Sequence, residues 1–84
     1  MVTISKPQQL LLYSTSACHL CEQASALVQP LLGQDWHLEV VDIAASDELF
    51  QRYGLTIPVL RRTDTGQEIN WPFDSQDVLT LLAA

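Results

Sequence analysis

The first half of the chain changes from one hydrophobic period to another. A short run of consecutive apolar residues, 10–13, stops at a polar Ser-Thr-Ser segment, which is typical of a strand buried on both faces. The next apolar residues recur at helical spacing, at Cys21, Ala24, Leu27, Val28, Leu31 and Leu32. We expect this helix to end or kink near Pro30, before a turn at Gly33. Residues 37–43, rich in β-branched side chains, predict a second strand.

A short helix is predicted after the second strand. Ser46 fits its N-cap, because a serine hydroxyl can accept a hydrogen bond from a free amide of the first turn. Leu49, Phe50 and Tyr53 would face inward, and Gly54 would end the helix.

A hairpin and a last helix follow. Residues 56–62 predict a third strand and residues 67–70 a fourth, joined by a turn in which Gly66 takes the positive φ. Asp74 fits the N-cap of the last helix. The apolar face of that helix would consist of Val78, Leu79 and Leu82.

The order of these elements is β-α-β-α-β-β-α, which predicts an α/β fold. The strand–helix–strand start implies a right-handed crossover and a parallel pair, whereas the short turn implies an antiparallel pair. We therefore expect a four-stranded mixed sheet with helices on both faces. At 84 residues the chain suits a single domain over 1–84.

The charge balance narrows the classes of partner. The net charge is −6, and the four basic residues are Lys6, Arg52, Arg61 and Arg62. Because an acidic domain repels phosphate backbones, we expect no nucleic-acid partner. No stretch reaches about 20 apolar residues, and residues 1–16 do not fit a signal peptide. We expect a monomeric protein of the cytosol that does not enter a membrane.

Both cysteines of the chain, Cys18 and Cys21, fall where the first strand gives way to the first helix. A redox dithiol needs one accessible thiolate and a second thiol within reach. A zinc site would need four ligands, and the pair supplies two. A structural disulfide would close too short a loop to restrain the unfolded chain much. We favour the redox interpretation over these two and over coincidence.

The helical position predicts different roles for the two thiols. Cys18 lies at the helix start, where unpaired amides and the helix dipole stabilise an anion, so it would be the exposed attacking group. Cys21 belongs to the apolar stripe and would be the shielded resolving group. A protonated His19 would favour the Cys18 thiolate.

Three segments carry a family resemblance. Residues 10–28, with the Cys-x-x-Cys, residues 56–62, with Thr-Ile-Pro, and residues 70–82 together resemble the glutaredoxins and the wider thioredoxin fold. The Trp-Pro-Phe-Asp segment, 71–74, is similar to a small bacterial glutaredoxin-like family. The resemblance covers nearly the whole chain and implies a thioredoxin-like fold.

The resemblance also implies roles for particular residues. Pro58 would be a cis-proline facing the dithiol, and Ile57 would offer its backbone N–H and C=O to an extended peptide or to glutathione. The γ-glutamyl end of glutathione would bind at Asp74 and Ser75. Its glycine carboxylate would meet Arg52 or Arg61. Since Arg61 and Arg62 alternate across a strand, at most one of them can face the site.

The sequence departs from the usual glutaredoxin at three places. Thr15 stands where glutaredoxins carry a lysine, which removes an anion contact. His19 and Leu20 replace the usual Pro-Tyr between the cysteines. Trp71 and Pro72 occupy a region where a Gly-Gly pair usually lets the backbone approach glutathione. A tryptophan there would narrow or cover the glutathione groove. Trp71 and Phe73 are expected either to form a substrate-facing rim or to pack under the last helix.

These observations predict a thiol–disulfide oxidoreductase with no bound cofactor. Glutathione is a possible co-substrate, and the partner would be a disulfide-containing protein or a small-molecule thiol. One alternative is a carrier of an iron–sulfur cluster, in which Cys18 from each of two protomers and two glutathione thiols are the ligands. Another is an interaction module that keeps the fold without turnover.

Overall fold

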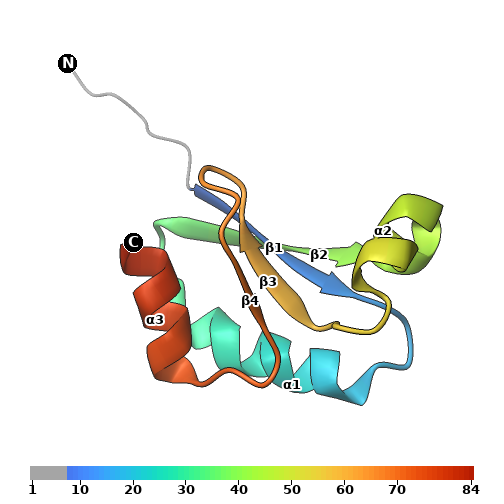
Figure 1. Ribbon diagram of the computed structural model, residues 1–84. Coiled ribbons are helices and arrows are strands. Elements are labelled where there is room, and N and C mark those ends of the chain that lie inside the picture. Colours follow the sequence, from blue (N-terminus) through green and yellow to red (C-terminus); the bar gives the residue numbers. More distant parts are fainter. Residues whose placement is uncertain (1–7) are drawn as a thin grey trace.

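The polypeptide chain folds into a four-stranded mixed sheet with helices on both faces (Figure 1). The computed structural model describes residues 8–84, so Lys6 and the first part of segment 1–16 lie outside the described residues. The strands are β1 (Gln8–Ser14), β2 (Trp36–Asp42), β3 (Val59–Arg62) and β4 (Glu68–Asn70). The helices are α1 (His19–Val28), α2 (Asp47–Tyr53) and α3 (Ser75–Ala83), with short 3₁₀ turns at Gln29–Leu31 and Ile43–Ala45.

The strand order is β2-β1-β3-β4, and the predicted pairing is confirmed. Strand β1 runs parallel to β2, with Leu12 opposite Val40, as the crossover through α1 requires. Strands β1 and β3 pair antiparallel, and so do β3 and β4. The β3–β4 turn contains Gly66 at φ 77°, the positive φ expected from the sequence.

Two apolar clusters fix the helices to opposite faces of the sheet. The larger cluster joins β1 and β3 to α1 and α3, and its buried members are Leu10, Leu12, Ala24, Val28, Leu32, Leu60, Phe73, Val78 and Leu81. The smaller one lies under α2 and consists of Tyr13, Ile43, Tyr53 and Val59. In Figure 1 α1 and α3 accordingly lie along one face, while α2 covers only one end of the other.

Two predicted inward-facing residues point to solvent instead. Phe50 is 57% exposed, because in a helix of two turns Leu49 and Tyr53, four positions apart, take the face toward the sheet. Leu79 is 44% exposed, since the stripe of α3 runs through Val78, Leu81 and Leu82 and leaves Leu79 about 100° away.

The third strand is shorter than the sequence predicts. It begins at Val59 and not at Thr56. The amides of Thr56 and Ile57 both donate to the carbonyl of Tyr53, at 2.9 and 3.0 Å. These two residues therefore continue the turn that ends α2, and their amides are lost to the β ladder.

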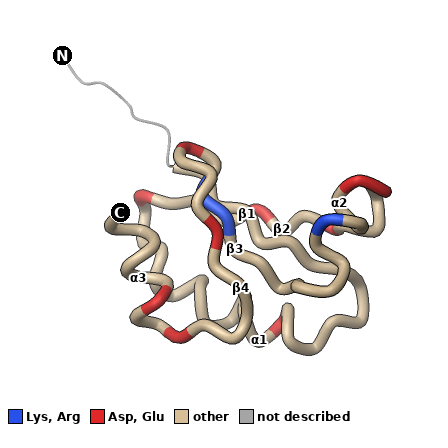
Figure 2. The backbone as a smooth tube through the Cα atoms, in the orientation of Figure 1, with Lys and Arg blue, Asp and Glu red and all other residues tan. Residues whose placement is uncertain are grey.

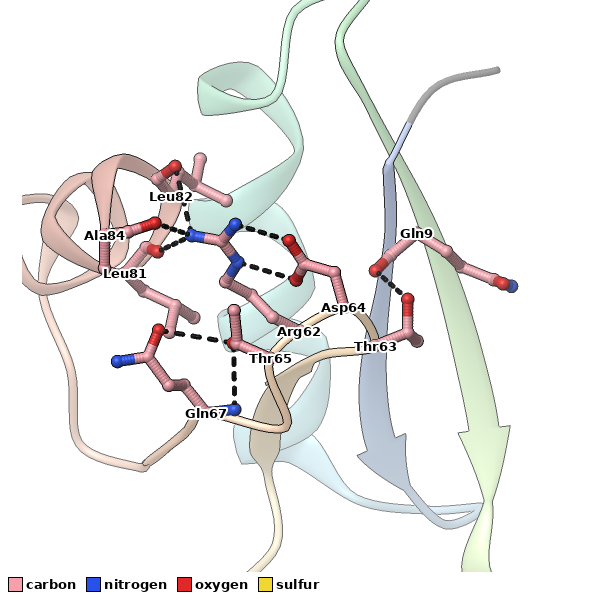
Figure 3. A network of polar contacts seen from close by, with 9 residues as sticks. All are labelled: Gln9, Arg62, Thr63, Asp64, Thr65, Gln67, Leu81, Leu82 and Ala84. Carbon is pink, nitrogen blue, oxygen red and sulfur yellow. Dashed lines mark hydrogen bonds and ion pairs between the residues drawn. The ribbon is translucent and has the colours of Figure 1, made fainter. Parts of the chain in front are cut away.

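Arg62 anchors the last helix to the hairpin turn (Figure 3). Its Nε and Nη2 donate to the two carboxylate oxygens of Asp64, at 3.0 and 2.7 Å. Its Nη1 donates to the carbonyls of Leu81 and Ala84, at 2.8 and 2.6 Å. The side chain also lies over the Trp36 ring, 4.9 Å from its centroid. The structure thus buries Arg62, whose guanidinium supplies donors to the free carbonyls at the end of α3.

Candidate functional site

The two cysteines form a disulfide at the start of α1. Cys18 is the N-cap residue, and its Sγ accepts a hydrogen bond from the Cys21 amide at 3.1 Å. The Cα atoms of the pair are 5.2 Å apart. Cys18 is half-buried, whereas Cys21 is 3% exposed and belongs to the buried side of the helix. The structure therefore places the outer and inner sulfur atoms as the helical spacing predicts.

A backbone turn at Ala17 aims Cys18 into the helix start. Ala17 has φ 59°, in the left-handed region that residues with a side chain rarely adopt. Such a conformation costs an L-residue about 1–2 kcal/mol. Nothing in the sequence predicted it, because glycine and asparagine mark such positions and alanine does not. The strained residue lies directly before the outer cysteine.

The Pro58 loop leaves the sheet at the same end as the disulfide loop. The Ile57–Pro58 peptide bond is cis, as the resemblance implies, and Pro58 is buried. Because Tyr13 pairs with Val59 in the antiparallel register, the chain leaves β1 beside the point where Pro58 enters β3. The two loops therefore emerge from neighbouring strands.

Of the two Ile57 backbone groups expected to bind a substrate, the N–H already forms a hydrogen bond within the protein. Its N–H donates to Tyr53, so a substrate backbone could pair with the Ile57 carbonyl but would compete for the amide. The sequence did not predict this bond, because it depends on how α2 ends.

Trp71 is held next to the proline loop. Its amide donates to the Pro58 carbonyl at 3.1 Å, and the Trp71–Pro72 bond is a second cis bond that was not expected from the sequence. The Trp71 ring meets the Phe73 ring edge-on, with centroids 5.1 Å apart. Phe73 is buried and Trp71 is half-buried, so the pair packs largely into the core under α3.

Asp74 and Ser75 lie at the exposed start of α3. Asp74 is the N-cap, as predicted, and its carboxylate accepts the Asp77 amide at 2.8 Å. In turn, the Asp77 carboxylate accepts a hydrogen bond from the Asp74 amide at 3.0 Å. Capping thus occupies one Asp74 oxygen, while Ser75 is exposed at the first position of the helix.

The two candidate arginines lie on the α2 face of the sheet. Arg61 is 3.8 Å from Glu68, and hydrogen bonding to Tyr13 and Tyr53 raises the pKa of its guanidinium. Tyr53 also donates to Glu68, and burial, followed by this bond, raises the pKa of Tyr53. Arg52 is exposed and lies 5.3 Å from the centroid of the Tyr53 ring. Arg61 is therefore paired with a carboxylate within the protein.

A cavity of about 300 Å³ opens directly beside the disulfide. It lies between the start of α1, the loop after β1 and the edge strand β2. Its lining consists of Leu12, Ser14, Thr15, Ser16, Ala17, Cys18, Cys21, Glu22, Ser25 and Val40. Among the predicted site residues, the cysteines border it, but the residues expected to bind glutathione do not. Glu22 and Val40 were not predicted as site residues from the sequence, because their proximity to the disulfide depends on how α1 lies across the sheet.

His19 and Glu22 form an exposed pair on α1. The His19 Nδ1 is 3.7 Å from a Glu22 carboxylate oxygen, and the two side chains are 81% and 80% exposed. His19 thus has an acidic neighbour within the same turn as the disulfide.

Two further features of residues 8–84 bear on function. No described group of three His, Cys, Asp or Glu residues could hold a metal ion. None of the described helices has the length and apolar character needed to cross a bilayer.

Comparison with known proteins identifies what this fold and disulfide resemble. The family model described as "Glutaredoxin-like domain (DUF836)" matches residues 9–83. The chain has no match among curated proteins.

The chain is also similar to several solved structures. An X-ray structure of protein XcR50 from X. campestris is 42% identical, with a TM-score of 0.73, over 89% of this chain and 97% of that one. The solution structure of protein Ne2328 from Nitrosomonas europaea is 30% identical, with a TM-score of 0.76, over 98% of each chain. A malarial protein at 19% identity, with a TM-score of 0.65 over 92% of this chain and 94% of that one, shares the fold.

Proposed function

The chain belongs to the glutaredoxin-like domain family, and on that premise we propose that it is a thiol–disulfide oxidoreductase. The observation that carries the proposal is the placement of Cys18. Its sulfur caps α1 and accepts the Cys21 amide, while its disulfide partner is buried one turn further on. A hydrogen bond to a thiolate and the positive end of a helix both favour the reactive anion.

In the reduced protein the first step is attack by the Cys18 thiolate on a substrate disulfide. A bond forms between the Cys18 sulfur and one substrate sulfur, the substrate S–S bond breaks, and the other half leaves as a thiolate. The free amides at the start of α1 stabilise the Cys18 anion before attack.

In the second step Cys21, having lost its proton, attacks the Cys18 sulfur of the mixed disulfide. The Cys18–Cys21 disulfide forms, and the second half of the substrate leaves as a thiolate. Two electrons have then passed from the protein dithiol to the substrate. The cavity gives solvent a route to the otherwise buried Cys21, so that its proton can leave.

The proline loop would position the substrate backbone. We propose that the Ile57 carbonyl accepts a hydrogen bond from the substrate, with Pro58 beside the sulfur atoms. Glutathione is the proposed reductant that returns the disulfide to the dithiol, since a monothiol can open a half-exposed disulfide through Cys18. Comparing glutathione with a dithiol such as dithiothreitol at equal thiol concentration tests this assignment.

The central test is disulfide reductase turnover in wild type, Cys18→Ser and Cys21→Ser. We expect Cys18→Ser to reduce turnover to the uncatalysed rate. Cys21→Ser should instead accumulate a mixed disulfide on Cys18, visible by mass spectrometry. Alkylation of Cys18 should reach half its maximal rate at a pH below about 8.5, the value for a free cysteine.

Equal turnover in wild type and Cys18→Ser would disprove the proposal. Thermal unfolding of the reduced variants provides the control. Cys18→Ser should keep the wild-type midpoint, whereas Cys21→Ser should unfold cooperatively at a lower one, because its hydroxyl replaces a buried thiol. Capture of Cys21→Ser mixed disulfides from the native cell would then identify the substrate.

A further inference from the structure

The cavity beside the disulfide has one charged wall. Cys18, Glu22 and Ser25 are separated by four and three positions, so they follow one another along the same face of α1. The Glu22 amide donates to the Cys18 carbonyl at 3.2 Å, which confirms that Glu22 lies one turn above Cys18. A carboxylate therefore stands about one helical turn from the sulfur at which the substrate would bond.

The rest of the cavity lining is uncharged. It includes the hydroxyl-bearing Ser14, Thr15 and Ser16 and, from the edge strand, Val40. Among the described residues, Glu22 is the one charged side chain in the lining. A substituent that enters the cavity thus meets a negative charge, several hydroxyl groups and the apolar side chains of Leu12, Ala17 and Val40.

No basic side chain of the described residues offsets this carboxylate within the cavity. Figure 2 shows the blue segments of the described chain on β3 and α2, and red on α1. Arg62 is bound to Asp64 and the end of α3, and Arg61 is paired with Glu68. Arg52 lies on α2 over Tyr53. Within residues 8–84 the one ion-pair partner of Glu22 is His19, and it adds a positive charge only when protonated.

Resting on the proposed function, we propose that this cavity is a subsite for an ammonium group carried by a small aminothiol disulfide. Its volume of about 300 Å³ lies at the small end of ligand pockets. An ammonium group two carbons from the attacked disulfide would enter beside Glu22, and the hydroxyl groups of the loop would accept its remaining hydrogen bonds.

The chemistry is the two-step exchange described above. The Cys18 thiolate displaces one aminothiolate from the disulfide, and Cys21 then displaces the second from the mixed disulfide. The dithiol loses two electrons, and the substrate becomes two aminothiols.

Three symmetrical disulfides of similar length provide the test. Cystamine is cationic, bis(2-hydroxyethyl) disulfide is neutral and 3,3′-dithiodipropionate is anionic. Each is mixed in excess with pre-reduced protein at about pH 8, where protein histidines are predominantly uncharged. The rate of Cys18–Cys21 disulfide formation is measured for wild type, Glu22→Gln and Glu48→Gln.

For each probe, the wild-type rate is divided by the Glu22→Gln rate. This ratio removes differences in intrinsic reactivity between the three probes. Relative to the neutral probe, we expect this ratio to be about threefold higher for cystamine and about threefold lower for the anionic probe, as for a partly screened charge pair. Glu48→Gln removes the same charge from an exposed position on α2, and its ratio should be equal for all three probes.

Two outcomes overturn the proposal and are distinguishable. If wild type reduces all three probes but the Glu22→Gln ratio does not depend on probe charge, the subsite is wrong and the oxidoreductase function stands. If wild type reacts with none of the three probes faster than a free thiol such as N-acetylcysteine does at the same pH, both proposals fail.

Discussion

The two ends of strand β1 differ in how firmly the chain around them is held. At the start of β1 the Thr63 hydroxyl and amide both donate to the Gln9 carbonyl, at 3.0 and 3.3 Å. Beside them, the guanidinium of Arg62 joins the hairpin turn to the end of α3 (Figure 3). At the other end, β1 passes through Ala17, in the left-handed region, to a half-buried cysteine.

One end of β1 therefore stabilises the fold, and the other holds the reactive sulfur atoms. The arginine end satisfies charges and helix carbonyls within the protein, so its contacts favour the folded state. At the disulfide end the Cys18 sulfur stays accessible, a cavity opens beside it, and Ala17 has a strained backbone conformation. Strained backbone next to a reactive group persists only when the surrounding structure determines it, and here the fixed opposite end and the shared core provide that support.

The largest effect is expected at the arginine end. Replacement of Arg62 by methionine keeps the long apolar stem but leaves Asp64 and the carbonyls of α3 without their donors. We expect a larger fall in thermal midpoint than any substitution of Asp64 or Ala17 produces. Reductase turnover per folded molecule should stay at the wild-type value, because the disulfide lies at the other end of the sheet.

Arg62→Lys is the matched control for charge. Lysine keeps the positive charge but cannot bind both carboxylate oxygens and the α3 carbonyls at once, so it should recover only a minor part of the lost stability. A midpoint equal to wild type in Arg62→Met would contradict the role assigned to this network. A selective loss of turnover would contradict the separation of the two ends.

An acid titration tests the contact between Arg62 and Asp64, where we expect a smaller change in stability. The hydrogen bond from Arg62 lowers the pKa of Asp64 below its ordinary value of 3.8. Its stabilisation is therefore fully present above the ordinary pKa of 3.8 and is lost as the pH falls through the lowered native value. Denaturant unfolding of wild type and Asp64→Asn should show wild type more stable near neutral pH. This gap should close in acid below the ordinary pKa, and a gap unchanged down to the lowest pH would refute the assignment.

The smallest effect is expected at the disulfide end. Ala17→Gly removes the steric cost of a positive φ but also loosens the unfolded chain, so we expect a gain in unfolding free energy of at most about 1 kcal/mol. Ala17→Val should destabilise, because a β-branched residue tolerates this φ least. Denaturant titration of both variants measures the order Gly, Ala, Val, and a reversed order would show that residue 17 is not held in the left-handed region.

Some features of the site were predicted from short stretches of sequence. The Cys-x-x-Cys falls at the start of a helix, with Cys18 outward and Cys21 inward, because the apolar period of that helix already assigns each cysteine to a side. The N-caps at Ser46 and Asp74 and the positive φ of Gly66 are likewise confirmed. The caps depend on one side chain and an amide three positions away, and the turn depends on a residue without a side chain that adopts a positive φ.

Predictions failed where a helix is short or a strand competes with a turn. Phe50 and Leu79 are apolar residues close to a buried stripe, and sequence spacing alone cannot tell which side of the stripe meets the sheet. Thr56 and Ile57 have the composition of a strand, but their amides bond to the Tyr53 carbonyl at the end of α2.

Local patterns in the sequence were enough to predict the order of elements, the mixed sheet and the dithiol at a strand-to-helix junction, because periodicity, capping and turn chemistry act over a few residues. Three features became visible in the folded protein alone: Arg62 is buried against α3, Ala17 turns the chain into Cys18, and Glu22 shares a cavity with the disulfide and Val40. These features join segments far apart in the chain or depend on their packing. They follow from the strand register and the position of α1 across the sheet, which no local pattern specifies.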